Sequence, residues 1–216
     1  MAAMKAGVLG TGDVGRVLAG GLAGLGHAVT LGSRDAGKAR EVAAKAGSGV
    51  QGGTFADAVK GADLVVLATS WAGAENALKL AGGPAAFAGK VVMDATNPLD
   101  LSQGPPPKLN PAGTDSAGER VQRWLPGAKV VKAFNMVGNA HMVKPQFPGG
   151  PPDMLVAGND EGAKKAVTEV ARGLGWSVVD LGGIESARWL EALAMAWILY
   201  GFKTNTWNHA WKLLRK

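Results

Sequence analysis

The segment GVLGTGDVGRVLAGGLAGLGHAVTLGSRD, residues 7–35, decides the fold of this 216-residue chain. It begins as a short apolar run and passes into the pattern Gly10-x-Gly12-x-x-Gly15. Apolar side chains then recur at the i, i+3, i+4 and i+7 spacing of a helix, and a second apolar run covers residues 28–32. The order strand, glycine-rich turn, helix and strand is typical of a dinucleotide-binding unit.

Each glycine of this turn has a separate physical role. Gly10 makes the turn tight, Gly12 lets the backbone approach a pyrophosphate, and Gly15 lets the helix pack closely on the strand. The helix that starts near Asp13 would present free backbone N–H groups and the positive end of its dipole to the phosphates. We therefore expect a bound dinucleotide here; the alternative is a tight turn without a ligand.

The end of the second strand indicates which nucleotide is bound. NAD-binding proteins usually place Asp or Glu there to accept hydrogen bonds from the ribose. This chain has Ser33 and Arg34, with Lys38 one helical turn later. A guanidinium pairs with a 2′-phosphate and a carboxylate repels it, so these residues predict NADP(H). Two points stay open. Asp35 is an acid that lies one residue after the position of the acid in NAD-binding proteins, and the alternative interpretation of Arg34 and Lys38 is that they are solvated surface charges.

The alternation of strands and helices continues along the chain. Strands are predicted at residues 6–10, 28–32, 64–68, 90–94, 129–134, 154–157 and 177–180, with a weaker strand near 49–51. Helices are predicted at residues 13–25, 36–46, 54–60, 73–80, 116–125, 160–174 and 184–200. Near-continuously apolar strands between helices predict the α/β class, as a Rossmann fold with a doubly wound, mostly parallel sheet.

Two parts are expected in the chain. Residues 1–183 would form the NADP-binding Rossmann domain, with proline-rich loops inserted at 98–115 and 141–154. Residues 184–216 would form a short C-terminal helical extension that packs on the same domain or on a dimer partner.

The chemistry should lie beyond the carboxyl ends of the strands, where open α/β sheets bind ligands. These ends comprise residues 11–14, 33–34, 69–71, 95–98 and 134–136. They hold no Ser-His-Asp order, no HExxH motif and no carboxylate pair, so we expect neither a metal site nor a catalytic acid or base. Hydride transfer between two cofactors needs none, because the protein supplies proximity, orientation and hydrogen bonds to the rings.

Four other ionisable residues receive mostly structural interpretations. Lys132 lies inside a predicted strand, which favours a structural role over protonation of a substrate carbonyl. His27 directly precedes the second strand, so we expect a structural residue there. His209 lies in the tail, so we expect it at the surface. His141 lies beside a long loop, where a contact with substrate stays open.

The composition restricts the expected cellular location of the protein and the classes of partner that it can bind. The chain has no cysteine, which favours a reducing cytoplasm, and its basic residues are scattered despite a net charge of +6, which disfavours nucleic acid. No secretory signal is recognisable, and the most apolar stretch, residues 189–202, is too short to span a bilayer. We expect a cytoplasmic protein that acts on small molecules.

With these residues in place, the chain resembles the NADPH-dependent reductases of coenzyme F420. It equally resembles the nucleotide-binding domain of the STEAP metalloreductases, of the same superfamily. The matching segments are LGTGDVGRVLAGGLAGLGHAVTLGSRD, ADLVVLATSWAG, GKVVMDATNPL, LPGAKVVKAFN and GWSVVDLGGIESARWLEALAMAWI. DATNPL and VVKAFN are the more specific ones.

The resemblance implies roles for matched positions. The 2′-phosphate and pyrophosphate region would be held by Thr11, Ser33, Arg34 and Lys38, and the pyrophosphate would lie over Asp13 and Val14. The nicotinamide ribose would be surrounded by Thr69, Ser70 and Trp71. The nicotinamide and the acceptor ring would be bordered by Asn97, Ala133, Phe134 and Asn135. It also implies a homodimer whose sites use C-terminal elements of the partner.

The expected function is hydride transfer between NADP(H) and coenzyme F420 or a flavin (FMN or FAD). Three alternatives stay open at this point: a flavin or ferric-chelate reductase of the STEAP type, a small reductase of the β-hydroxyacid dehydrogenase type, and a non-enzymatic NADP(H)-binding protein. The second would need a further helical domain, and only about 35 residues follow the last predicted strand.

Overall fold

The computed structural model describes residues 2–214 and 216, and its centre is an eight-stranded sheet. The strands are β1 (Lys5–Leu9), β2 (Ala28–Ser33), β3 (Val50–Thr54), β4 (Leu64–Leu67), β5 (Val91–Asp94), β8 (Lys129–Lys132), β9 (Asp153–Gly158) and β10 (Ser177–Asp180). Their order is β10-β9-β8-β5-β4-β1-β2-β3. Every neighbouring pair is parallel except β8 and β9, which confirms the predicted doubly wound, mostly parallel sheet.

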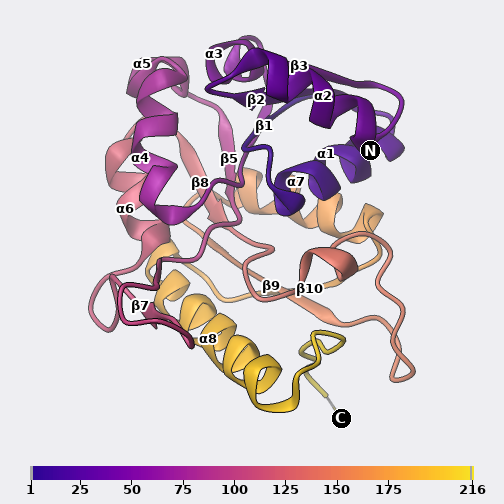
Figure 1. Ribbon diagram of the computed structural model, residues 1–216, viewed down its shortest axis with the longest axis vertical. Helices are drawn as coiled ribbons and strands as arrows, with labels where there is room; N and C mark the ends of the chain where they lie inside the picture. Colours follow the sequence, from indigo (N-terminus) through magenta and orange to yellow (C-terminus); the bar gives the residue numbers. More distant parts are fainter. Residues whose placement is uncertain (1, 215) are drawn as a thin grey trace.

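Helices cover both faces of this sheet (Figure 1). They are α1 (Asp13–Gly24), α2 (Ala36–Ala46), α3 (Phe55–Val59), α4 (Trp71–Leu80), α5 (Gly83–Ala86), α6 (Ala117–Trp124), α7 (Glu161–Gly173) and α8 (Ala187–Thr204). Successive strand residues face opposite layers: in β4, Val66 packs with Leu18 of α1, whereas Val65 packs with Leu78 of α4. None of the helices among the described residues is long and apolar enough to cross a membrane.

The structure corrects several predicted boundaries. The weak strand at 49–51 is a full edge strand, β3, and the helix after it begins at Phe55 rather than at residue 54. The reason is a capping box: the Thr54 hydroxyl accepts from the Asp57 N–H at 3.1 Å, and the Asp57 carboxylate accepts from the Thr54 N–H at 2.8 Å.

The strand predicted at 129–134 is shorter than expected. β8 ends at Lys132, where its pairing with Asp94 of β5 also ends. Two residues later, Phe134 is fully buried in the left-handed region at φ +60°, a conformation that bulky side chains rarely adopt. The chain therefore turns sharply before Asn135, which it carries to the edge of the sheet.

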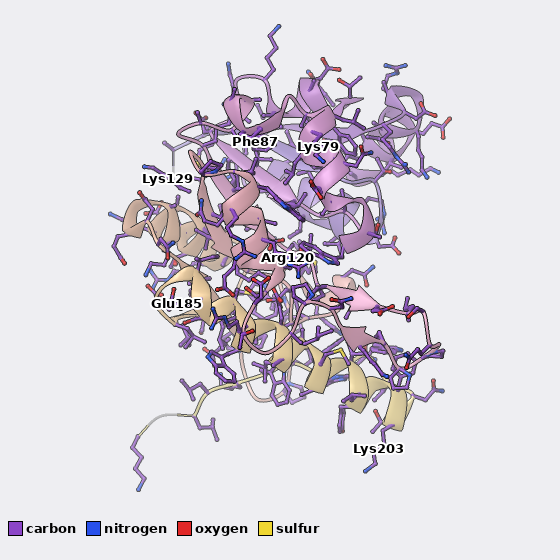
Figure 2. All side chains as sticks on the ribbon, turned by 90° about the vertical axis from the view of Figure 1, so that its left-hand side faces the viewer. Lys79, Phe87, Arg120, Lys129, Glu185 and Lys203 are labelled. Carbon is purple, nitrogen blue, oxygen red and sulfur yellow. The ribbon has the colours of Figure 1, made fainter. Side chains whose placement is uncertain are left out.

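Two further segments differ from the prediction. The first proline-rich loop contains a small antiparallel hairpin, formed by β6 (Leu99–Asp100) and β7 (Lys108–Leu109). The helix predicted at 184–200 begins as a 3-10 turn, Ile184–Ser186, and continues as α8 to Thr204. Figure 2 shows α8 along the lower part of the molecule, from near Glu185 to Lys203.

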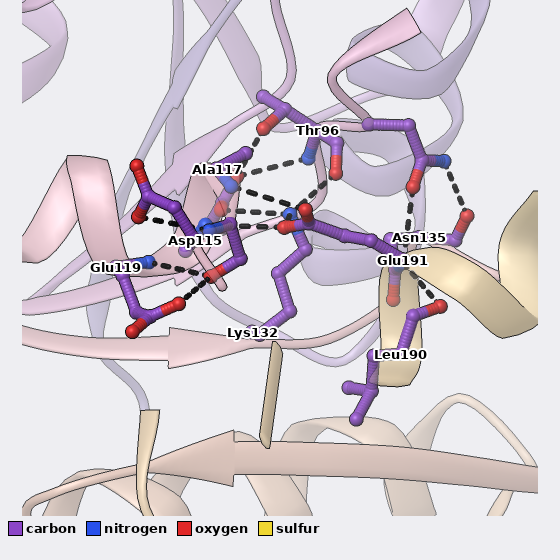
Figure 3. Close-up of polar contacts among 12 residues, drawn as sticks. Thr96, Asp115, Ala117, Glu119, Lys132, Asn135, Leu190 and Glu191 are labelled. Atoms are coloured by element: carbon purple, nitrogen blue, oxygen red, sulfur yellow. Dashed lines mark hydrogen bonds and ion pairs between the residues drawn. The ribbon is translucent and has the colours of Figure 1, made fainter. Parts of the chain in front are cut away.

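A buried ion cluster joins α8 to the sheet (Figure 3). The Lys132 Nζ atom lies 2.9 Å from a carboxylate oxygen of Asp94, 2.9 Å from one of Glu191, and 2.6 Å from the carbonyl oxygen of Thr96. These three acceptors use all three ammonium hydrogens. Glu191 also accepts from the N–H groups of Ala117 and Gly118, at the start of α6, at 3.0 and 3.1 Å.

Charge balance explains why this cluster is stable. Burial by itself would lower the pKa of Lys132, but the carboxylates of Asp94 and Glu191 outweigh it and hold that pKa above its usual value. The cluster carries one net negative charge, which faces the positive end of α6. Lys132 is therefore a charged structural residue, without a hydrogen left for a substrate.

Replacing the central charge should destabilise the fold strongly. Lys132→Met leaves two buried carboxylates without their cation, so we expect the free energy of unfolding to fall by about 3–5 kcal/mol. The control Lys129→Met removes a half-exposed lysine of the same strand and should cost no more than about 1 kcal/mol. Urea unfolding checks both values, and equal losses in the two variants would contradict the role of the cluster.

Candidate functional site

The glycine-rich turn between β1 and α1 is shaped to leave one side open. A Cβ on Gly10 would lie 2.4 Å from the carbonyl oxygen of Ala68, and one on Gly15 would lie 1.9 Å from that of Gly10. A Cβ on Gly12 would meet no protein atom within 4 Å. Gly12 also caps α1 without a side-chain hydrogen bond, so the first N–H groups of this helix face the open side.

A cavity of about 220 Å³ extends from this turn to the end of β2. Its walls include Gly12, Ser33, Arg34 and Thr69. Arg34 and Lys38 are exposed, and neither forms an ion pair with any residue that the structure describes. Arg34 thus lies in the cavity wall as an unpaired cation, at the place where a 2′-phosphate is expected, and Lys38 follows in the first turn of α2.

Asp35, the acid next to these cations, has another role. Its carboxylate accepts from the N–H groups of Gly37 and Lys38 at 2.7 and 3.2 Å, and so caps the N-terminus of α2. The acid that follows Arg34 is therefore engaged in capping α2.

Two larger cavities lie further along the strand ends. One, of about 570 Å³, lies beyond β4 and β5, between Trp71, Asn97 and Leu101. The other, of about 490 Å³, lies between the glycine turn and the C-terminal part of the chain, with Trp197 and Trp207 in its wall. Both cavities share the wall formed by Val14, Ala68, Thr69 and Ser70. The three cavities therefore meet around the end of β4.

Two asparagines from different strand ends are locked together beside these cavities (Figure 3). The Asn135 amide nitrogen donates to Asn97 Oδ1 and to the carbonyl oxygen of Leu190 in α8, both at 3.0 Å. Asn97 Nδ2 donates in turn to the Asn135 carbonyl oxygen. Among the described residues, no partner is found for the buried Asn135 Oδ1 or for the buried Thr69 Oγ1. Unpaired buried oxygens are costly. Thr69 lines all three cavities, so a ligand there can supply a hydrogen to it, whereas Asn135 lines none of them.

The structure places most of the predicted site residues around the cavities. Gly10, Thr11, Gly12, Asp13, Val14, Ser33, Arg34, Thr69, Ser70, Trp71 and Asn97 line at least one of them. Gly15 packs against the turn, and the Trp71 ring stacks on Trp124 with centroids 5.2 Å apart. Lys38 lies in the first turn of α2 and lines none of the cavities.

Ala133 and Phe134 lie elsewhere than expected. Both are fully buried in the hydrophobic core, and Phe134 packs edge-on against Trp176 with centroids 6.2 Å apart. Neither lines any of the three cavities. Asn135, also expected to border the rings, is 4% exposed and lines none of the three cavities either, whereas Asn97 lines one.

The histidines are used in protein contacts. His27 accepts from the Met4 N–H at the opposite end of the sheet, and burial lowers its pKa. His141 Nε2 lies 3.1 Å from Asn208 Oδ1. His209 is not the free surface residue expected from its place in the tail, because its ring stacks on Trp197 with centroids 4.6 Å apart.

Sequence reasoning missed the cavity wall formed by Trp197, Trp207, Gly138 and Asn139. These residues come from α8, from the tail after it and from the loop after β8, so no local motif joins them. The spacing of the tryptophans along the sequence does not by itself indicate a binding site. A single hint existed, namely that two of the chain's seven tryptophans lie in the short tail after the last predicted helix.

Comparisons with known proteins agree with this geometry. Residues 5–98 match the family model described as NADP oxidoreductase, coenzyme F420-dependent. The chain is 33% identical to the F420-dependent NADP reductase of Methanothermobacter marburgensis, with 95% of this chain and 96% of that protein covered. It is 31% identical to rat metalloreductase STEAP3 over 89% of its own length, but spans only 37% of that relative.

A solved structure from Arthrobacter sp. FB24, provisionally described as an F420-dependent NADP reductase, is similar over its whole length. The TM-score is 0.93 and the identity 43%, with 99% of this chain and 100% of the other covered. The likeness therefore includes the C-terminal tail as well as the sheet.

Proposed function

This chain belongs to the family of coenzyme F420-dependent NADP oxidoreductases, and on that premise we propose that it transfers hydride between NADP(H) and coenzyme F420. One observation carries the proposal. A cavity with the unpaired cation Arg34 in its wall meets two further cavities at the end of β4, so two large cofactors can approach each other there. We propose a cytoplasmic location, as expected from the sequence.

The residues at the first cavity fit NADP(H). Gly12 leaves room for the pyrophosphate, which the free N–H groups at the start of α1 would bind. Arg34 and Lys38 would pair with the 2′-phosphate, and Ser33 lies in the same wall. Asp35 does not oppose this, because its carboxylate is held by the N–H groups of α2.

The nicotinamide half would lie at the ends of β4 and β5. When bound there, NADPH would supply a hydride, and the acceptor would take up this hydride together with one proton from solvent. Thr69 Oγ1, at the wall that the three cavities share, would accept a hydrogen bond from a ligand, which relieves the cost of leaving it unpaired. The protein thus acts by holding two rings within about 3–3.5 Å of each other.

Reduction of a small keto acid is the weaker alternative. It needs a proton donor beside the substrate carbonyl. Lys132, the lysine nearest to a strand end, is fully buried and donates all its hydrogens to protein acceptors. The site therefore favours an acceptor that needs no acidic group from the protein. Coenzyme F420, FMN and FAD are acceptors of this kind.

An acceptor panel tests the proposal. Purified protein is mixed with NADPH and, in parallel, with coenzyme F420, FMN, FAD or a ferric chelate, and the consumption of NADPH is recorded. We expect the highest kcat/KM with coenzyme F420. No consumption with any acceptor would reject the proposed reaction, and a preference for ferric chelate or a flavin would favour an activity of the STEAP type.

The choice of nucleotide depends on Arg34. Arg34→Ala removes a charge-assisted contact with the 2′-phosphate, so NADPH affinity should fall roughly tenfold or more while NADH affinity stays the same. Arg40→Ala, which removes an exposed arginine of the following helix, α2, that lines none of the three cavities, is the control and should leave both affinities unchanged. Equilibrium titration measures these values, and unchanged NADPH affinity in Arg34→Ala would overturn the NADP assignment.

We also propose that the chain forms a homodimer through the outer face of α8. This face exposes the large apolar residues Trp189, Leu199, Tyr200 and Phe202. Apolar surface of this kind is typical of protein interfaces. The proposal is supported by the exposure alone, since the inner face of α8 already packs on the chain's own sheet through Leu190 and Ala194.

Light scattering tests the dimer. Wild-type protein should show twice the mass of one chain, and Leu199→Glu should shift it toward the monomer because a charge is placed in the interface. Leu80→Glu is the control, since Leu80 is similarly exposed (50% against 47%) but lies on α4. A monomeric wild type would reject the dimer.

A further inference from the structure

Trp207 lies in the wall of the second large cavity, which reaches the glycine turn. The same cavity is lined by Gly12, Asp13 and Val14 of this turn and by Thr69 and Ser70 after β4. We propose that Trp207 is the aromatic platform on which the planar ring of the hydride acceptor stacks, and that it thereby determines acceptor specificity. This inference rests on the proposed function.

The tail that carries Trp207 is held in place by hydrogen bonds on both sides. Trp197 Nε1 donates to the carbonyl oxygen of His209 at 2.8 Å, and His209 Nε2 lies 3.0 Å from the Trp197 carbonyl oxygen. Further along, the Asp153 N–H donates to the Trp211 carbonyl oxygen at 3.0 Å, and the Asp153 carboxylate accepts from the Leu213 N–H at 2.7 Å. The tail is therefore a fixed part of the cavity wall.

The indole of Trp207 is positioned by its neighbours. It packs against Trp197 with centroids 5.3 Å apart and edge-on against Phe202 at 5.5 Å. Gly201 makes room for it, since a Cβ at this position would lie 2.4 Å from Trp207 Cζ3. With 42% of its surface exposed in spite of these contacts, Trp207 still offers area to a ligand.

The course of the nucleotide decides which ring this cavity receives. The adenosine end fits the cavity at β2, and the pyrophosphate fits the turn at Gly12. The nicotinamide then falls beyond β4 and β5, in the cavity that Asn97 lines. The cavity under Trp207 is left for the second ring, and the shared wall at Thr69 and Ser70 lets the two rings meet.

This assignment predicts a separation of the two affinities. Trp207→Ala should weaken binding of oxidised coenzyme F420 to the protein–NADP⁺ complex roughly tenfold or more, because a stacking partner is lost. The affinity for NADPH should change by less than about twofold, since the nucleotide does not contact the platform. Trp207→Phe, which keeps a smaller ring, should lie between wild type and Trp207→Ala.

Two further variants separate stacking from general damage to the tail. Gly201→Ala keeps Trp207 but displaces its indole, so it should weaken acceptor binding as Trp207→Ala does. Trp211→Ala removes a tryptophan of the same tail with comparable exposure (36%) that lines none of the three cavities, and should leave acceptor binding unchanged.

Equilibrium binding and steady-state kinetics are measured on the same preparations. In turnover, Trp207→Ala should raise the KM for the acceptor more than it lowers kcat. The inference is overturned if Trp207→Ala binds the acceptor like Trp211→Ala, if it loses NADPH and acceptor affinity equally, or if the wild type binds neither coenzyme F420 nor a flavin. Wild-type binding without turnover would reject the proposed reaction while the affinities still decide the role of Trp207.

Discussion

A single buried cation holds the site together. Lys132 joins β8 to Asp94 of β5 and to Glu191 of α8, and Glu191 in turn binds the start of α6. A buried ion pair adds little net stability over a well-packed apolar core, but losing one partner is costly. The cluster therefore specifies where α8 lies. With Glu191 fixed, its neighbour Leu190 reaches Asn135, and Trp197, two turns further along the helix, reaches the cavity.

The proposed hydride transfer would need neither an acid nor a base from the protein. Most charged groups near the cavities are engaged within the fold: Asp13 pairs with Arg16, and Asp100 accepts from the Ser102 N–H. Arg34 is free for a phosphate, Asp35 is engaged as a helix cap, and Lys132 is enclosed by acceptors. What remains around the end of β4 is a set of fixed oxygens and aromatic walls, which suits the positioning of two rings.

The elements that sequence reasoning located well are those with a strong local pattern. The glycine turn, the apolar strands and the amphipathic α7 each carry their own periodicity within a few residues. The segments it located poorly depend on distant partners. β8 ends where its neighbour β5 ends, and Phe134 takes a left-handed conformation because the core receives its ring beside Trp176. No local pattern predicts either event.

The same division holds for the site. The sequence alone determined a dinucleotide turn, a strand end with cations in place of an acid, and a fold that brings the strand ends to one edge, since each follows from neighbouring residues. Only the tertiary structure decided that Asp35 caps a helix, that Ala133 and Phe134 are buried, and that Trp207 completes the cavity wall. These are contacts between side chains and backbone groups whose geometry depends on packing, and packing is a property of the whole fold.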